Sequence, residues 1–173
     1  PGVIKELYDF ATSLAFKVVA AGKGKNNPLD REATPRSLRK IAVSRNMNPK
    51  MLTEFVDGSK TMIEMAALAN ATGLVPDIRG MHGPQCSVKE LSSVFALRDK
   101  GGVLSQNGVI DYARGDIAPG VFVVISTDNP HLKKDLHYLM MGSGPNYLLY
   151  RPYHLANIEV PISIARAILY REP

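Results

Sequence analysis

The strongest constraint on the fold is an uninterrupted apolar run at residues 121–125, which reads Val-Phe-Val-Val-Ile. A strand with one face in water alternates apolar and polar residues, and this run has no such alternation. We therefore expect a strand that is buried on both faces, in a sheet that helices cover. Three more apolar segments are predicted strands, at residues 15–20, 109–113 and 147–150.

Helical patterns separate these strands. Apolar residues recur at helical spacing in residues 3–14 and again from Pro161 to Leu169. An N-capping residue followed by proline, the usual start of a helix, occurs at Thr34-Pro35, Asn48-Pro49 and Asn129-Pro130. A capping box opens another helix at Ser87. These signals predict helices over residues 34–45, 49–72, 87–97 and 129–141.

The predicted fold is therefore α+β (mixed α/β), with a mixed sheet covered by helices. The longest helix, residues 49–72, should end at Gly73. Its buried stripe is expected to consist of Leu52, Phe55, Val56, Met62, Ile63, Ala66 and Ala69.

Composition excludes several classes of protein. The net charge of +5 is modest, the basic residues are scattered, and no nucleic-acid-binding motif occurs. No apolar run is long enough to cross a bilayer, and no signal peptide is visible. The single cysteine, Cys86, excludes an internal disulfide and fits a reducing compartment. We expect a cytoplasmic protein that binds neither nucleic acid nor membranes, and the start at Pro1 suggests a piece of a longer protein.

The most distinctive polar segment follows the first predicted strand. Residues 22–27 read Gly-Lys-Gly-Lys-Asn-Asn and open a polar segment, residues 22–33, that is expected to be an exposed loop. Glycines let a backbone approach a ligand closely, Lys23 and Lys25 supply positive charge, and Asn26 and Asn27 supply amides. This combination favours a small anion such as a phosphate or carboxylate. The alternative is a solvated turn, and the spacing does not match a dinucleotide fingerprint.

Asp57, Lys60, Thr61 and Glu64 are expected to share a polar stripe of the long helix. Asp57 and Lys60 suit proton transfer near a carbonyl or hydroxyl group if burial shifts their pKa values. The alternative is an exposed ion pair between Lys60 and Glu64, which spacing alone favours.

A further polar segment, Arg151, Tyr153 and His154, follows the last predicted strand. An arginine at a strand end can hold a phosphate with two hydrogen bonds, and its neighbours can add more. The alternative is a cap on an edge strand. His82 lies between glycines in a predicted loop and could act as a general acid or base, but a polar residue without a catalytic role is the favoured interpretation. Metal ligands have no local signature, although Mg²⁺ or Mn²⁺ on carboxylates stays compatible with the sequence.

Five segments together resemble the catalytic portion of homoserine-dehydrogenase-like oxidoreductases. They are residues 18–30, 46–49, 54–61, 151–155 and 159–167. The closer similarity is to the branch that includes the deoxyxylulose phosphate reductoisomerase-like enzymes and SAF-domain proteins, and it covers nearly the whole chain.

The resemblance implies that residues 1–173 form the substrate-binding and dimer-forming domain of an NAD(P)-dependent oxidoreductase. A Rossmann domain that binds NADP or NAD would precede it and is absent from this chain, so the fragment alone should be inactive. The substrate would be a small anionic hydroxy or keto compound, which is phosphorylated in the reductoisomerase-like members. The implied catalytic residues are Lys25, Asp57 and Lys60, and the substrate-binding residues are Lys23, Asn26, Asn27, Arg151, Tyr153 and His154. The alternative function is a non-catalytic anion-binding or dimerisation module.

Overall fold

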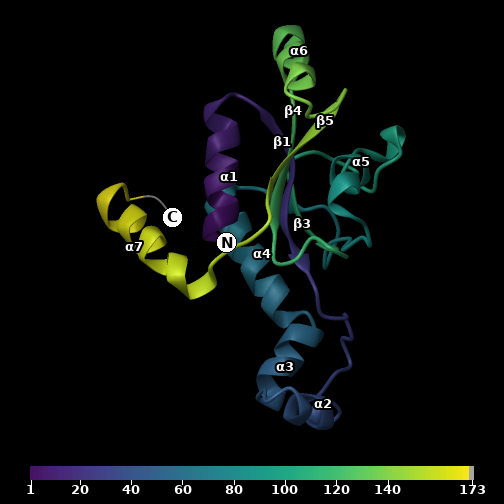
Figure 1. Cartoon of the computed structure of the whole chain (residues 1–173), viewed down its shortest axis with the longest axis vertical. Coiled ribbons are helices and arrows are strands. Elements are labelled where there is room, and N and C mark those ends of the chain that lie inside the picture. The colour runs from purple at the N-terminus through teal and green to yellow at the C-terminus, as the bar shows by residue number, and fades with distance from the viewer. Residues whose placement is uncertain (172–173) are drawn as a thin grey trace.

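The computed structural model describes residues 1–171, and the order of their elements is shown in Figure 1. The helices are α1 Gly2–Ser13, α2 Arg39–Ser44, α3 Pro49–Val56, α4 Ser59–Thr72, α5 Leu91–Val94, α6 Pro130–Tyr138 and α7 Val160–Leu169. Three short 3-10 turns are η1 Val88–Glu90, η2 Arg98–Lys100 and η3 Ala156–Glu159. The strands are β1 Lys17–Lys25, β2 Val75–Pro76, β3 Val109–Arg114, β4 Val121–Ser126 and β5 Asn146–Arg151.

The strands form one mixed sheet in the order β2-β3-β1-β4-β5. β1 pairs in parallel with β3 and antiparallel with β4, so it lies at the centre. A register shift between Val18 and Ala20 places Val19 and Ala20 in the same core cluster, although neighbouring residues of a regular strand face opposite sides. The predicted α+β class is confirmed.

Both faces of the sheet are covered, as the apolar run at residues 121–125 predicts. Val121, Val123 and Ile125 pack into one core with α1 and α4. Phe122 and Val124 pack into a second core with α5 and the segment after it. Figure 1 shows α1 and α4 on one side of the sheet and α5 on the other. The expectation that β4 is buried on both faces is confirmed.

β1 runs five residues further than predicted, so the expectation of an exposed loop is wrong for residues 22–25, and the loop begins at Asn26. Gly22 and Gly24 lie inside the strand and are buried, as is Lys25. A Cβ on Gly22 would lie 1.8 Å from the carbonyl oxygen of Asp111, and one on Gly24 would lie 2.3 Å from the amide nitrogen of Ala118. The two glycines therefore make room for the protein's own backbone at Asp111 and Ala118.

The predicted long helix over residues 49–72 is also wrong, because the chain breaks into α3 and α4 at Asp57 and Gly58. Gly58 has φ +91°, a left-handed conformation that glycine adopts without a steric penalty. The break resets the helical phase, so the buried residues of α4 are Thr61, Met65 and Leu68. Ile63 of the predicted stripe is 70% exposed, and Ala66 is exposed as well.

Three other helices are shorter than predicted. α2 begins at Arg39, after a turn in which Thr34 and Ser37 exchange hydrogen bonds between their amides and hydroxyl groups. The segment after Ser87 forms η1 and the four-residue α5, and α6 ends at Tyr138. α2 and α3 enclose a small satellite core, which consists of Ala33, Ala42, Leu52 and Val56.

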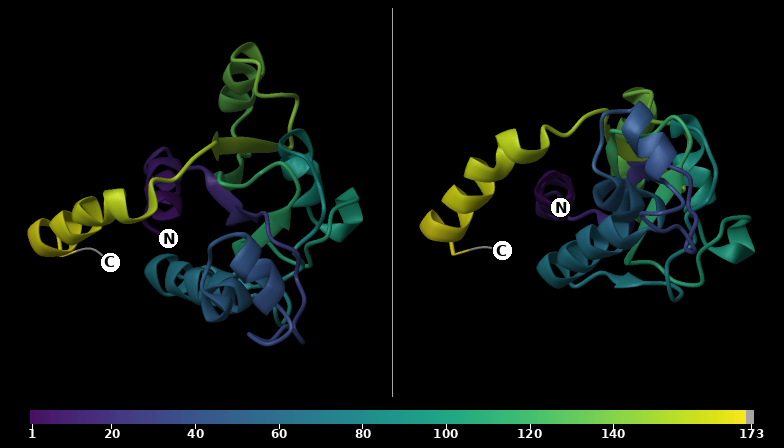
Figure 2. Two further views of the ribbon diagram at one scale, coloured as in Figure 1. Left: turned by 60° about the horizontal axis from the view of Figure 1, so that its bottom comes forward. Right: turned by 90° about the horizontal axis from the view of Figure 1, so that it is seen from below.

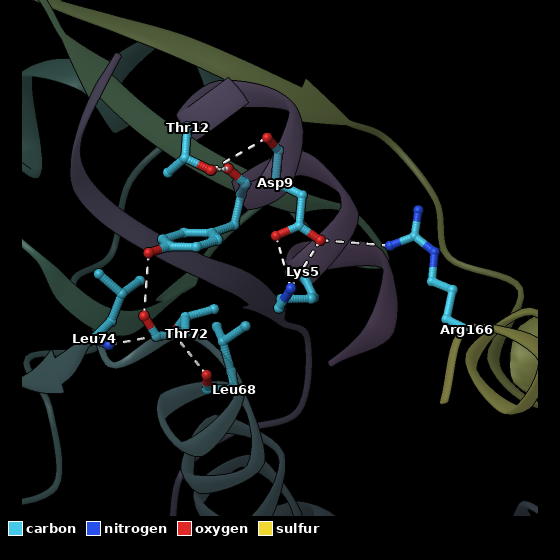
Figure 3. Close-up of polar contacts among 8 residues, drawn as sticks. Lys5, Asp9, Thr12, Leu68, Thr72, Leu74 and Arg166 are labelled. Atoms are coloured by element: carbon cyan, nitrogen blue, oxygen red, sulfur yellow. Dashed lines mark hydrogen bonds and ion pairs between the residues drawn. The ribbon is translucent and has the colours of Figure 1, made fainter. Parts of the chain in front are cut away.

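α7 extends away from the sheet, as both views of Figure 2 show, and none of its side chains is buried. A hydrogen bond links α7 to α1, because Arg166 of α7 donates to the Asp9 carboxylate at 3.5 Å (Figure 3). The same carboxylate accepts from Lys5 of α1 at 2.7 Å. Tyr8 also lies on α1, and its hydroxyl donates a hydrogen bond to the Thr72 carbonyl at 3.1 Å, which fixes α1 against the end of α4.

Candidate functional site

Lys23 and Lys25 lie on the same face of β1, the face that α1 and α4 cover, because alternate residues of a strand point to one side. The Lys23 ammonium forms an ion pair with Glu64 of α4. Lys60 lies one helical turn before Glu64, and its ammonium is 3.8 Å from the same carboxylate. Lys60 is half exposed and stands 4.5 Å above the Phe55 ring. Two lysines from different elements thus share one carboxylate.

Lys25 is the most buried of these lysines, with only 6% of its surface exposed. Its Nζ donates a hydrogen bond to the carbonyl oxygen of Phe55 at 2.5 Å. Phe55 lies in the last turn of α3, where carbonyl groups lack partners within the helix. The break at Gly58 ends the helix, so this carbonyl is left for Lys25.

Burial lowers the pKa of the Lys25 ammonium, and the positive charge of Lys23 lowers it further. Asp57 acts in the opposite direction and raises that pKa, but its effect does not cancel the first two. The Asp57 carboxylate accepts a hydrogen bond at 2.8 Å from the amide of Ser59, the first residue of α4. Asp57 therefore acts on Lys25 through its charge, whereas the sequence predicts a proton-transfer pair of Asp57 and Lys60.

One cavity of about 260 Å³ brings most of the predicted site residues together. Its lining includes Lys23, Lys25, Asn26, Asn27, Lys60 and His154. The wall is completed by Gly24, Phe55, Thr61, Ala118 and Pro119. The residues come from β1, α3, α4, the loop before β4 and the segment after β5, so the tertiary fold assembles them from distant parts of the chain.

His154 reaches this cavity through a contact with the loop before β4. Its Nδ1 lies 2.5 Å from the carbonyl oxygen of Pro119. That loop is fixed to the sheet, because the Gly24 amide donates to the Gly120 carbonyl at 2.9 Å and the Tyr150 hydroxyl donates to the Ile117 carbonyl at 2.9 Å.

Arg151 and Tyr153 are not among the described residues that line this cavity. The Arg151 guanidinium bonds to Glu159 at 2.7 Å and to Glu6 at 3.4 Å, and it stands 4.8 Å from the centre of the Tyr153 ring. Two carboxylates and a ring thus hold the arginine in place. Of the substrate-binding residues predicted in this segment, Arg151, Tyr153 and His154, His154 alone lines the cavity.

A second cavity of about 250 Å³ adjoins the first, and Lys23, Lys60 and His154 line both. Its other walls are largely apolar and come from α1, β4 and the start of α7, with Val3, Ile4, Val121 and Val160. Glu6, Glu64 and Glu159 add carboxylates. The two cavities together offer a cationic half and a mainly apolar half.

His82 lies elsewhere, in a cluster between β2 and β3. Its Nδ1 is 2.9 Å from Oδ2 of the fully buried Asp111, and its Nε2 is 3.4 Å from the Asp77 carboxylate. The amides of His82 and Gly83 also donate to Asp111, each at 3.0 Å. His82 therefore joins two loops to the sheet. This structural role agrees with the sequence-based interpretation of His82 as a polar residue rather than a general acid or base.

Two further properties concern metals and membranes. Within residues 1–171, no group of three or more His, Cys, Asp or Glu side chains is arranged to hold a metal ion. The carboxylate-bound Mg²⁺ or Mn²⁺ that the sequence leaves open thus finds no ligand cluster in that range. None of the helices in the described part combines the length and apolar character that crossing a bilayer requires.

The geometry defines a mixed α/β domain with a lysine-rich cavity beside its central strand. Residues 1–160 match the family model described as Oxidoreductase DRL, catalytic domain. This chain belongs to that family, and so it is an oxidoreductase catalytic domain. None of the curated proteins matches the chain.

Sequence reasoning missed several groups that form the site. The Phe55 carbonyl and the Ala118-Pro119 segment contribute backbone, which leaves no signal in side-chain patterns. The sequence predicts Thr61 on a polar stripe with Asp57, but Thr61 is buried against the cavity. The spacing of Lys60 and Glu64 indicates their ion pair, whereas no local pattern indicates the ion pair between Glu64 and Lys23, which are 41 positions apart.

Proposed function

We propose that this chain is the substrate-binding catalytic domain of an NAD(P)-dependent oxidoreductase that acts on a small anionic hydroxy or keto compound. The observation that carries the proposal is the convergence of Lys23, Lys25 and Lys60 on one cavity. Glu64 balances one of these charges, so the lysines leave a surplus of positive charge for an anion. A dianion such as a phosphate ester suits that surplus better than a monoanion.

Each site residue has a distinct part in this proposal. Lys60 is half exposed and free to swing toward an anionic group, and Asn26 and Asn27 add amide hydrogen bonds. Lys25 is fixed by Phe55 and polarises the reacting oxygen with its ammonium. Asp57, at the α3–α4 junction, favours the charged form of Lys25, because its negative charge raises the pKa of that lysine against the effect of burial.

When bound, the nicotinamide cofactor, NADP or NAD, exchanges a hydride with the substrate carbon. Gly22 and Gly24 do not form a turn for the phosphates of a dinucleotide, because both lie within β1 and pack against protein backbone. We propose that another domain holds most of the cofactor, as the resemblance implies. The homo-oligomer that the resemblance also implies stays a prediction, which sedimentation of the protein tests.

Sulfate is a suitable probe of the anion site, because it keeps two negative charges near neutral pH. Calorimetry should show that Lys25→Met and Lys60→Met each weaken sulfate binding about tenfold, as expected for loss of one charge-assisted hydrogen bond. Lys133→Met removes the same charge from the exposed surface of α6 and should change the affinity less than about twofold. Equal effects of all three variants would refute a specific anion site.

Oxidoreductase activity is tested on the whole protein that contains this chain. Oxidation of NADPH or NADH is followed with a panel of phosphorylated and unphosphorylated keto compounds. The catalytic proposal predicts that Lys25→Met and Asp57→Asn both lower kcat. If only sulfate binding changes and no panel compound is turned over by the native protein, the non-catalytic anion-binding module is the better description.

A further inference from the structure

His154 occupies an unusual position, because its imidazole lines both cavities where they meet at Lys23 and Lys60. It is the one histidine among the described residues that line either cavity. Histidine is the side chain that ordinarily changes its charge between pH 5 and 8, so it is suited to take and return protons in that range.

The contact with Pro119 fixes which ring nitrogen carries the hydrogen. A carbonyl oxygen only accepts, so Nδ1 at 2.5 Å must donate to it. In the neutral imidazole, Nε2 then holds a lone pair and remains for a ligand in the cavities that the ring lines. The acceptor itself is rigid, because the backbone of Gly24 packs directly on Ala118 and bonds to Gly120.

The other charged groups around the two cavities are poorly suited to this task. Lys23 is paired with Glu64, and Lys25 donates to the Phe55 carbonyl. Lys60 approaches Glu64, and Glu159 is bonded to Arg151, which also contacts Glu6. Asp57, which the sequence predicts together with Lys60 as a proton-transfer residue, accepts from the Ser59 amide and is not among the described lining residues.

We propose that His154 is the proton-transfer residue of this site, an inference that rests on the proposed oxidoreductase function. As a substrate alcohol is oxidised, its O–H proton passes to His154 Nε2 and its carbon loses a hydride to the oxidised nicotinamide cofactor. The C–O single bond becomes a carbonyl, and the two electrons leave with the hydride. In reduction, the imidazolium returns the proton to the oxygen that the incoming hydride has made negative. Lys25 stabilises the charge on that oxygen.

Nitrogen NMR of the histidine rings tests the tautomer without any ligand. Above pH 8, the His154 signals of the native protein should report a hydrogen on Nδ1 and none on Nε2. Gly24→Ala, which displaces the Ala118–Gly120 loop, should abolish this preference, whereas Gly101→Ala points into open space and should preserve it. A native ring with its hydrogen on Nε2 would overturn the proposal.

Sulfate calorimetry at pH 5.5 and 8 tests the proton at Nε2, because sulfate does not titrate in this range. Protonated His154 adds a charged donor to the cavity, so the native protein should bind sulfate about tenfold more tightly at the lower pH. His154→Gln should remove this pH dependence. His137→Gln, the same change on the exposed face of α6, should leave the dependence intact.

The possible failures separate this inference from the proposed function. Sulfate binding that is equally strong at both pH values, or a pH dependence that survives in His154→Gln, would overturn the role of His154 alone. Absence of sulfate binding to the native protein would overturn the anion site and the inference together. In the active whole protein, His154→Gln should lower kcat and remove the acidic limb of its pH profile, while Asp57→Asn should keep that limb.

Discussion

The Lys25 ammonium donates to the Phe55 carbonyl across 2.5 Å, and this contact joins the central strand of the sheet to the end of α3. The contact depends on the break between α3 and α4, because that break leaves the Phe55 carbonyl in a terminal helical turn. A glycine at position 58 thereby helps to position a lysine that precedes it by 33 residues in the chain.

Gly58→Ala should destabilise the protein by about 1–3 kcal/mol, because alanine is strained at φ +91° and its Cβ would lie 2.9 Å from Leu29. Chemical denaturation measures this change. Gly73→Ala imposes a similar φ of +75° at the other end of α4, with no atom within 4 Å of the added Cβ. It should cost less and leave sulfate affinity unchanged, whereas Gly58→Ala should weaken sulfate binding. Equal effects of both variants would contradict the link to Lys25.

Lys25 should make stability depend on pH in the alkaline range. Because burial lowers its pKa in the folded state, the unfolded chain binds more protons between that lowered pKa and the ordinary lysine value of about 10.4. The free energy of unfolding therefore gains a positive contribution as pH rises through this window. Denaturation curves measured across pH 7–10 should show the native protein gaining stability relative to Lys25→Met as pH rises, and a constant difference between the two would refute the shift.

Asp57→Asn should lower the pKa of Lys25 further, because Asp57 is the neighbouring charge that raises it. The alkaline window described for Lys25 should then begin at a lower pH. An asparagine oxygen still accepts a hydrogen bond from the Ser59 amide, whereas Asp57→Ala removes both the charge and this hydrogen bond, at a cost of about 1 kcal/mol. Equal stability of the asparagine and alanine variants at neutral pH would show that this hydrogen bond is unimportant.

Ser105→Ala should make the protein more sensitive to acid. Burial raises the pKa of the Asp77 carboxyl, but hydrogen bonds from the Ser105 hydroxyl and amide and the nearby His82 bring it below its ordinary value. Ionised Asp77 thus contributes stability above that ordinary value, and the contribution is lost as pH falls through the lowered pKa. The acid-unfolding midpoint of Ser105→Ala, followed by circular dichroism, should move to higher pH. Ser13→Ala, at the exposed end of α1, should not move it.

The sequence predicted those features that depend on neighbouring residues. The apolar run of β4, the proline-marked starts of α3 and α6, and the Gly73 stop of α4 all lie where local rules place them. The charged and amide residues after Ala21 also line a common cavity, although they do so from a strand rather than from the predicted loop. Local patterns could not tell a bend for a ligand from glycines that make room for Asp111 and Ala118.

By itself, then, the sequence determined the fold class and the segment that bears Lys23 and Lys25, because periodicity and capping are short-range properties. The tertiary structure alone decided that Lys25 meets Phe55, that Glu64 serves two lysines, and that His154 rather than Arg151 enters the cavity. The physical reason is that each of these contacts satisfies a charge or hydrogen-bonding group with a partner far along the chain. The identity of such a partner is set only when the sheet and its covering helices have packed.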